Sequence, residues 1–462
     1  MFIGRDAELQ QLNELYQANK FQCVIIWGRR RVGKTTLINE FIKDKLAIYF
    51  TATESTAKDN LESFSQSISF MQSKNLNNIP LYQSFEQALL AVYQLAQEQH
   101  LVLVIDEYPY LAKSYKPISS ILQKLIDTQF KNNSKLFIIL CGSSMSFMER
   151  QVLGYQSPLY GRRTAQLEIK PFNFYEYKSY YQNFSAEELA IVYGITGGIP
   201  QYMTFFNDKL SLKSNIINNF LRPGGYLYEE PENLLKQEMR EPAAYNAIIR
   251  AIASGASKNS EIASKVGMET SALANYIEKL LELDIIEKES PIGTKGSRKT
   301  IYSIKDTMFA FWYRFIPSNN ILIQRHLGEF AWKNIESQLS HFMGHIFEKI
   351  CTDYLWQTYE TLPIFYQQIG RWWGTNPKLK RQEEIDIVAT DEINAIVCEC
   401  KWRNEKVELS VIQTLLERAT LLPYQHYNYY IFSKSGFSKQ CQDYAENHKN
   451  IRLINYLDML KA

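Results

Sequence analysis

The chain has 462 residues, of which 45% are hydrophobic and 22% charged, so the composition excludes a disordered protein and leaves room for three or four domains. The formal net charge of only +2 excludes binding of nucleic acid through an overall basic surface, so any such contact must come from local patches. Because the N-terminus is charged and the apolar runs are too short to span a bilayer, we expect a cytoplasmic protein with no membrane partner.

The cysteines give no sign of a disulfide framework or a zinc site. They form no CxxC pair and have no histidine at zinc-ligand spacing. We therefore expect free thiols in a reducing compartment. The six positions are Cys23, Cys141, Cys351, Cys398, Cys400 and Cys441.

Residues 1–165 alternate short apolar runs with helical patterns. The runs are QCVIIW, AIYF, LVLVID and LFIILCG. Strands that alternate with helices are typical of a parallel sheet wrapped by helices. We therefore predict an α/β core in this part of the chain.

A glycine-rich loop between the first apolar run and the next helical segment predicts an ATP site. Gly28 and Gly33 fit GxxxxGK[ST], in which backbone N–H groups and a helix N-terminus face the phosphates. We predict that Lys34 reaches the β- and γ-phosphates and that the Thr35 hydroxyl ligates Mg²⁺. A chance glycine-rich turn is the alternative. The candidate nucleotide-binding residues here are Gly28, Arg29, Arg30, Arg31, Val32, Gly33, Lys34, Thr35 and Thr36.

Polar residues follow two later strands of the predicted sheet. Asp106 and Glu107 end the run LVLVIDE, and Ser143 and Ser144 end LFIILCGSS. The carboxyl ends of parallel strands meet at one edge of a sheet, where ligands bind. We predict that Asp106 contributes to the Mg²⁺ shell and that Glu107 orients and deprotonates the attacking water. The two serines are candidate sensors of the γ-phosphate.

Six motifs in a fixed order carry a family resemblance. They are FIGRDAEL (2–9), WGRRRVGKTTL (27–37), VIDEYPYL (104–111), CGSS (141–144), SPLYGRRT (157–164) and GGIPQYM (197–203). In these motifs the chain resembles the archaeal-type ATPases, which are AAA+/STAND-related P-loop proteins, and the resemblance extends over essentially the whole chain.

The resemblance implies further roles in the ATP site. Arg5 would lie near the adenine, and residues 198–200 would belong to a helical lid. Arg162 or Arg163 would act as an arginine finger or sensor, because a guanidinium can neutralise charge on the γ-phosphoryl group. A surface salt bridge is the alternative for this pair. A homo-oligomer of this chain is one assembly that the sequence allows.

Residues 240–312 contain three short helical segments followed by a glycine-bearing hairpin, which predicts a winged helix-turn-helix. Cations on the loop PIGTKGSRKT would lie along a DNA backbone while the third helix faces a groove. Docking of this domain on the ATPase core as a nucleotide-responsive lid is the alternative. The residues in question are Lys295, Arg298 and Lys299 on the loop, and Ser271, Asn275 and Lys279 on the helix.

The stretch EEIDIVATDEINAIVCECKW, residues 383–402, predicts a β-hairpin. With its turn centred on residues 392 and 393, antiparallel pairing places Asp386 across from Glu399 and beside Lys401. Facing carboxylates repel one another unless a divalent cation lies between them. We predict that Asp386 and Glu399 hold a metal that supports cleavage of nucleic acid, with Lys401 positioning the water or the developing anion. A solvated edge hairpin is the alternative.

The same pattern, with an ECK motif thirteen residues after the aspartate of IDIV, resembles the PD-(D/E)xK nucleases. It is also similar to the restriction-endonuclease-fold domain attached to some archaeal-type ATPases. That resemblance implies Glu348, on the preceding helical segment, as a further metal ligand. Aromatic residues Trp372 and Trp373 lie among cations, which suits a nucleic-acid channel, although tryptophans are equally typical of a core. The cations are Arg371, Lys378, Lys380 and Arg381.

Together these observations predict an α/β protein that uses ATP and Mg²⁺ to control DNA binding and metal-dependent DNA cleavage. The alternative is an ATP-dependent switch that binds DNA or protein and has a catalytically inactive nuclease-fold domain. The predicted parts are a P-loop ATPase core at 1–165, a helical lid at 166–239, a winged helix at 240–312 and a restriction-endonuclease-like domain at 330–462.

Overall fold

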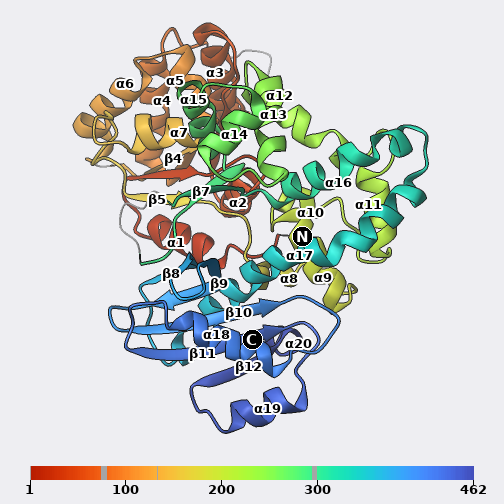
Figure 1. Ribbon diagram of the computed structural model, residues 1–462. Coiled ribbons are helices and arrows are strands. Elements are labelled where there is room, and N and C mark those ends of the chain that lie inside the picture. The colour runs from red at the N-terminus through yellow and green to blue at the C-terminus, as the bar shows by residue number, and fades with distance from the viewer. Residues whose placement is uncertain (1, 74–80, 133, 294–298, 462) are drawn as a thin grey trace. The chain divides into compact units, whose positions relative to one another are not determined.

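The computed structural model describes residues 2–73, 81–132, 134–293 and 299–461, which fall into two compact units (Figure 1). The first unit is Met1–Pro171 together with Ile199–Gln201, and the second is Phe172–Gly198 together with Tyr202–Ala462. Of the predicted DNA-contacting residues, Lys295 and Arg298 lie outside the described residues.

The first unit contains a five-stranded parallel sheet with the order β2-β3-β4-β1-β5. Its strands carry mostly apolar residues and are largely buried, as expected of a parallel sheet covered on both faces. The predicted α/β core is therefore confirmed. The strands are β1 (Gln22–Trp27), β2 (Ala47–Thr51), β3 (Leu101–Asp106), β4 (Leu136–Gly142) and β5 (Ala165–Glu168).

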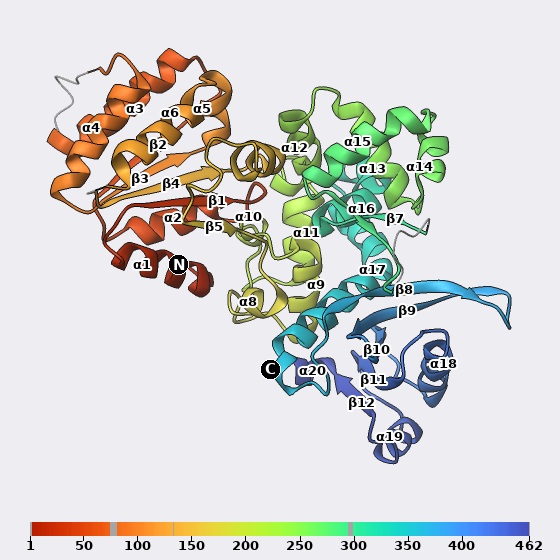
Figure 2. The same ribbon diagram turned by 90° about the vertical axis from the view of Figure 1, so that its left-hand side faces the viewer.

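Helices cover both faces of this sheet (Figure 2). Alternate residues of one strand serve the two faces, so that Val24 and Ile26 join one core while Cys23 and Ile25 join the other. On the first face lie α1 (Asp6–Gln17) and α2 (Lys34–Ile42). On the second lie α3 (Ala57–Ser73), α4 (Phe85–Glu98), α5 (Tyr108–Ser114) and α6 (Ile118–Leu125). The remaining short helices of this unit are η1 (Ile126–Phe130), α7 (Met145–Phe147) and η2 (Met148–Leu153).

The second unit begins with helices and a small hairpin. The helices α13 (Pro242–Ala253), α14 (Asn259–Val266) and α15 (Thr270–Glu282) precede the antiparallel strands β6 (Ile286–Glu289) and β7 (Ile301–Ile304). Three helices and a hairpin thus occur where the sequence predicts them. Before them come α8 (Phe174–Lys178), α9 (Ala186–Thr196), α10 (Pro200–Met203), α11 (Leu212–Phe220), η3 (Tyr226–Tyr228) and α12 (Glu230–Glu238).

Two long helices, α16 (Thr307–Gln324) and α17 (Gly328–Gln357), lead to a second sheet with the order β12-β11-β10-β9-β8. The strands β8, β9 and β10 are antiparallel, whereas β10, β11 and β12 run parallel. Figure 2 shows the β8–β9 hairpin reaching past the rest of its sheet. The elements are β8 (Gln368–Asn376), β9 (Arg381–Thr390), β10 (Asn394–Lys401), β11 (His426–Ser433), β12 (Ile451–Asn455), η4 (Tyr359–Thr361), α18 (Leu409–Ala419), α19 (Lys439–Glu446) and α20 (Tyr456–Met459).

The sequence makes predictions about the cysteines and about the membrane-spanning potential of the helices. All six cysteines are buried and free. Within the described ranges, no helix combines the length and the apolar character needed to cross a membrane.

A substitution at Gly28 tests the packing of the first unit, because the surroundings of this residue leave no room for a side chain. Its φ is +149°, and a Cβ atom added there would lie 2.3 Å from the carbonyl oxygen of Ile169. We expect Gly28→Ala to lower the free energy of unfolding by about 3 kcal/mol, measured by urea denaturation. Gly161 also has positive φ, at +73°, but its added Cβ would meet nothing within 4 Å. Gly161→Ala should therefore cost only about 1 kcal/mol, and equal losses in the two variants would contradict the clash.

Candidate functional site

The glycine-rich loop of the first unit has the backbone shape of an anion site. Arg31 and Gly33 adopt left-handed φ values of +74° and +89°, and α2 then begins at Lys34. No side chain caps the N-terminus of α2, so its first N–H groups are not satisfied by a capping residue. Uncapped N–H groups and the helix dipole together attract phosphate.

Lys34 lies inside this loop. Its Nζ donates hydrogen bonds to the carbonyl oxygens of Gly28 at 2.8 Å and Arg29 at 2.9 Å. Burial lowers the pKa of the Lys34 ammonium, while the nearby carboxylates of Glu107 and Asp106 oppose that change. The ammonium is thus buried without a direct carboxylate partner, which leaves its charge available for an anion.

Two carboxylates follow β3 and are held by hydroxyl groups. Asp106 Oδ2 accepts hydrogen bonds from Thr35 Oγ1 at 3.2 Å and from Tyr49 at 2.7 Å. Burial raises the pKa of Tyr49, which keeps its hydroxyl protonated as a donor. Ser143 Oγ lies 2.8 and 2.9 Å from the two carboxylate oxygens of Glu107. Because β4 lies between β1 and β3, the serine at its end is brought beside Glu107.

Two arginines of the first unit bind groups close to the glycine-rich loop, and their predicted roles at the nucleotide stay predictions. The guanidinium of Arg5 is buried and donates to the carbonyl oxygens of Val32, at 3.2 Å, and Lys170. It therefore fastens the glycine-rich loop to the segment after β5. Arg30 donates to the Tyr110 hydroxyl at 2.8 Å.

Arg162 and Arg163 also have partners within the first unit. The guanidinium of Arg162 donates to Asp127 Oδ2 at 2.7 and 2.9 Å, which is the salt bridge considered as the alternative to an arginine finger. Arg163 donates to the carbonyl oxygen of Leu153 at 2.9 Å and lies over the ring of Tyr160.

The other predicted residues surround the loop. Val32 packs in the core, Arg29 is buried, and Thr35 and Thr36 are exposed on the first turn of α2. From the GGIPQYM motif, Gln201 N donates to the carbonyl oxygen of Arg31 at 3.3 Å. Residues 199–201 therefore contact the glycine-rich loop, and Gly198 belongs to the second unit.

The second cluster of polar residues lies on β9 and β10. These strands pair up to Ile387 opposite Cys398, which is the predicted register, and Asp386 and Glu399 are the residues that come directly after this last pair. Both strands are internal to the sheet, and Asp386 and Glu399 are 9% and 6% exposed. The alternative of a solvated edge hairpin is therefore wrong.

Burial and charge act on these two acids differently. Burial raises the pKa of Asp386 to about 7, with further contributions from the charges of Glu399 and Glu348. Asp386 Oδ2 also accepts a hydrogen bond from Cys400 N at 2.7 Å. Glu399 forms ion pairs with Lys401 and with Arg418 on α18, the latter at 3.4 Å. We call Glu348, Asp386, Glu399 and Lys401 the carboxylate pocket.

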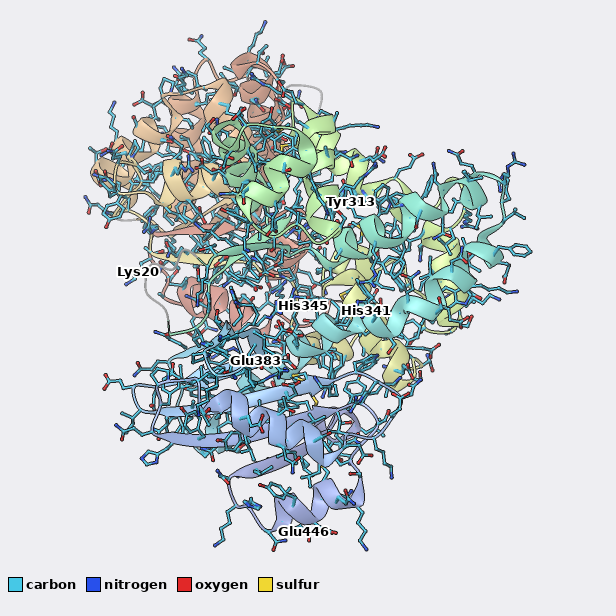
Figure 3. All side chains as sticks on the ribbon, viewed as in Figure 1. Lys20, Tyr313, His341, His345, Glu383 and Glu446 are labelled. Carbon is cyan, nitrogen blue, oxygen red and sulfur yellow. The ribbon has the colours of Figure 1, made fainter. Side chains whose placement is uncertain are left out.

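Glu348 reaches the pocket from α17. Its Oε2 lies 3.1 Å from His345 Nδ1 and 3.6 Å from Arg371 Nε. Figure 3 shows His345 on α17 and Glu383 on β9. A cavity of about 420 Å³ and another of about 710 Å³ are both lined by His345, Glu348 and Asp386. The acids therefore adjoin open space although they are mostly buried.

The donor types suit a hard cation such as Mg²⁺, since three carboxylates approach one region and one of them has a raised pKa. The present side-chain positions hold Glu348 and Glu399 against cationic groups. Within the described residues no group of three or more His, Cys, Asp or Glu side chains is set to hold a metal ion.

The basic block before the pocket divides between surface and interior. Lys378 and Lys380 are exposed at the turn of the β8–β9 hairpin, whereas Arg381 pairs with Glu383 at 2.7 Å. Trp372 packs against the core of the C-terminal sheet, and Trp373 lines the smaller cavity.

Sequence reasoning missed three functional neighbours. Tyr49 and Arg418 bind predicted acids, and His345 adjoins Glu348. The spacing of His345 three residues before Glu348 on a helix was a usable signal. Tyr49 and Arg418 carried none, because their partners lie on other elements.

Comparison with known proteins places two family matches on the chain. An ATPase domain predominantly from Archaea matches residues 2–206. A family of archaeal and bacterial proteins of unknown function matches residues 312–412, which include the whole carboxylate pocket.

Similar proteins extend over more of the chain. Protein MJECL04 of Methanocaldococcus jannaschii is 34% identical over 411 residues, covering 88% of each chain. The ATP-binding protein MJ0423 of the same organism is 47% identical over 45 residues, which are 10% of this chain and 76% of that protein. Among solved structures, a Walker-type ATPase of Pyrococcus abyssi, PABY2304, has a TM-score of 0.50 at 20% identity and covers 68% of this chain and 96% of its own. The last similarity shows a shared fold.

Lys34 provides a test of the loop. Removing its buried ammonium should weaken ATP binding by about 100-fold, because a charge-assisted hydrogen bond to phosphate is lost. Isothermal titration calorimetry of Lys34→Ala would measure this loss. Lys43→Ala is the matched control, because Lys43 directly follows the same helix and its side chain is 73% exposed, and this variant should bind ATP as wild type does. Wild-type affinity in Lys34→Ala would contradict the site.

Glu107 provides a separate test of turnover. Its carboxylate is the proposed proton acceptor, so Glu107→Gln should retain ATP binding and hydrolyse ATP about 100-fold to 10,000-fold more slowly. Phosphate release would measure the rate, with the exposed Glu98→Gln as control. Hydrolysis by Glu107→Gln at the wild-type rate would remove this residue from the base role.

Proposed function

This chain belongs to the family of ATPases whose domain is found predominantly in Archaea, and from that premise we propose that it uses ATP to control DNA binding and metal-dependent DNA cleavage by its carboxylate pocket. The chain is an ATPase with a P-loop fold in its first unit. The proposal concerns how ATP hydrolysis is used and which residues carry it out.

In the proposed ATP site, Lys34 neutralises charge on the β- and γ-phosphates. Thr35 and Asp106 offer the oxygen ligands that Mg²⁺ prefers, and the ion would add charge neutralisation at the phosphates. Glu107 accepts the proton of the attacking water. Ser143, whose hydroxyl lies within 2.9 Å of both Glu107 oxygens, holds that carboxylate in place.

Arg163 is the stronger candidate of the two arginines for stabilising transition-state charge. The guanidinium of Arg162 is engaged by Asp127 and by the carbonyl oxygens of Pro158 and Tyr160. Arg163 donates one hydrogen bond, at 2.9 Å, to the carbonyl oxygen of Leu153. Its reorientation toward a phosphate would therefore break fewer contacts.

The observation that carries the nuclease proposal is that Asp386 and Glu399 are both buried and follow the last pair, Ile387 with Cys398, of two internal strands, where the charge of Glu399 acts on Asp386. Two buried carboxylates side by side are unfavourable alone, and their retention is explained if they act on a cation. A bound Mg²⁺ would supply a hydroxide nucleophile and charge stabilisation at the scissile phosphate. Asp386 and Glu399, with Glu348, would hold the ion, and Lys401 would orient the water or the leaving oxygen.

DNA is the proposed partner because exposed basic and polar side chains lie at the turn of the β8–β9 hairpin, on α15 and in the loop between β6 and β7. Lys378 and Lys380 are exposed on the protruding β8–β9 hairpin, which suits contact with a phosphate backbone. On α15, Ser271 and Asn275 are exposed, whereas Lys279 pairs with Glu282 at 3.0 Å. Lys299 is exposed at the end of the hairpin loop. We propose that α13–α15 and β6–β7 act as a winged helix on DNA.

A second candidate is an ATP-dependent switch with an inactive nuclease fold. The ion pairs of Glu399 with Lys401 and Arg418 favour this function, because these two cations already neutralise the negative charge of Glu399 that would otherwise attract a metal. In that case the carboxylate pocket would be a structural network, and DNA or protein binding would be the output.

Cleavage assays distinguish the two functions. We expect wild type to cut linear, circular or single-stranded DNA with Mg²⁺ or Mn²⁺, and Asp386→Ala and Glu399→Ala to cut at least about 100-fold more slowly. Each reaction is run with and without ATP. Glu392→Ala, in the exposed turn between β9 and β10, is the matched control. Absence of cutting by wild type in every condition, or equal cutting by the pocket variants, would leave the switch as the function.

A further inference from the structure

The β6–β7 hairpin is docked on β8, the edge strand of the C-terminal sheet. Directly after β6, Ile292 N donates a hydrogen bond to the carbonyl oxygen of Arg371 at 3.0 Å. The Ile292 side chain packs against the core of that sheet. A Cβ atom at Gly293 would lie 3.3 Å from the Tyr424 hydroxyl. A backbone hydrogen bond and an apolar contact thus connect the hairpin to the sheet, and Gly293 leaves room for the nearby Tyr424 hydroxyl.

The docking brings an acid of the hairpin to Arg371. The nitrogen atoms of this guanidinium face three carboxylates, with Nη1 to Glu289, Nε to Glu348 and Nη2 to Glu384 all measuring 3.6 Å. The acids come from three elements, β6, α17 and β9. Glu289 is the one supplied by the hairpin, and Glu348 belongs to the carboxylate pocket.

Glu289 is held by charge rather than by a hydrogen bond. Its Oε2 atom is buried without a hydrogen-bond partner, and its side chain is 21% exposed. A buried carboxylate oxygen without a donor is unfavourable, which offsets part of its attraction to Arg371. The contact is therefore one that can open at modest cost.

The hairpin also walls both cavities of the pocket. The cavity of about 420 Å³ is lined by Glu289 and Ser290 on the β6 side and by Asp386 and Arg371. The cavity of about 710 Å³ is lined by residues 301–304 of β7 and by Asp386 and Lys401. A ligand that reaches Asp386 through either cavity therefore passes the hairpin.

We propose that the β6–β7 hairpin is a latch on the carboxylate pocket, meaning that it closes the pocket while it is docked. In the docked state Glu289 pairs with Arg371, whose guanidinium otherwise binds a phosphate of nucleic acid. An arginine binds carboxylate and phosphate oxygens through the same donors, so Glu289 takes the position of the phosphate. The latch regulates the proposed nuclease site, so this inference rests on the proposed function. Undocking of the hairpin removes Glu289, one of the three carboxylates that face Arg371, so that a phosphate can take its place, and it opens both cavities.

The test separates the latch from the nuclease by using two readouts on the full chain. Hydrogen exchange of residues 286–293 and 368–376 reports docking directly. Glu289→Gln should speed exchange in both segments by about fivefold, the factor expected for loss of a partly exposed ion pair. Glu287→Gln is the matched control, since it removes a charge from the same strand, and Glu287 pairs with Ser303 rather than with Arg371. Ile292→Ala removes the apolar contact and should also speed exchange.

Cleavage of a labelled DNA duplex with Mg²⁺ is then measured on the same variants. Faster exchange together with faster cutting in Glu289→Gln and Ile292→Ala, but not in Glu287→Gln, supports the latch. Unchanged exchange in both variants overturns it, whatever the cutting rate. Faster exchange without faster cutting, in a protein whose wild type cuts, overturns control of the site by the hairpin. Faster exchange with no cutting by any form supports the docking contact and removes the nuclease function instead.

Discussion

A carboxylate buried at a strand of a β-sheet must find donors or cations, and both units of this chain are built around that requirement. Asp106 is 6% exposed, Asp386 is 9% exposed and Glu399 is 6% exposed. None of these acids could be buried unless neighbouring elements supplied partners at defined positions.

The two units meet the requirement in different ways. In the first, hydroxyl groups of Thr35, Tyr49 and Ser143 bind Asp106 and Glu107. Hydroxyl donors stabilise a carboxylate but leave its charge in place. In the second, Lys401 and Arg418 pair with Glu399, and Arg371 pairs with Glu348. Cations cancel the charge outright, so a metal ion entering that pocket must compete with them.

Much of this arrangement could be predicted from the sequence because it depends on local rules. The strand, loop and helix around Gly28, Gly33 and Lys34 are contiguous, and two of the loop's positive φ values fall on these glycines, which adopt them at low cost. The pairing of Asp386 with Glu399 followed from strand periodicity and a short turn, and the ladder from Ala395 opposite Thr390 to Cys398 opposite Ile387 confirms that register. In both cases the relevant residues lie close in sequence or are fixed by a two-residue repeat.

The missed partners depend on packing between distant elements. Arg418 on α18 joins Glu383 to Glu399, and nothing in its own helix distinguishes it from any surface arginine. Arg5 is a further case: its guanidinium binds the backbone carbonyls of Val32 and Lys170, which its spacing in the sequence does not reveal, and its place near the adenine stays a prediction. An arginine has five donors and a long side chain, so its partner is set by the folded surroundings rather than by spacing.

The difference between hydroxyl and cationic partners has a mechanistic consequence. A site whose acids keep their charge is ready for a cation as it stands, and Lys34 lies nearby without a direct carboxylate partner to meet the phosphates. In the carboxylate pocket, Glu348 and Glu399 are already paired with arginine and lysine, so a cation that bound there would have to displace one of these contacts. Arg371 pairs both with Glu289 of the hairpin and with Glu348 of the pocket, so it would transmit the release of such a contact. If Glu289 moved away, Arg371 would bind Glu348 more strongly or would bind a phosphate in place of Glu289.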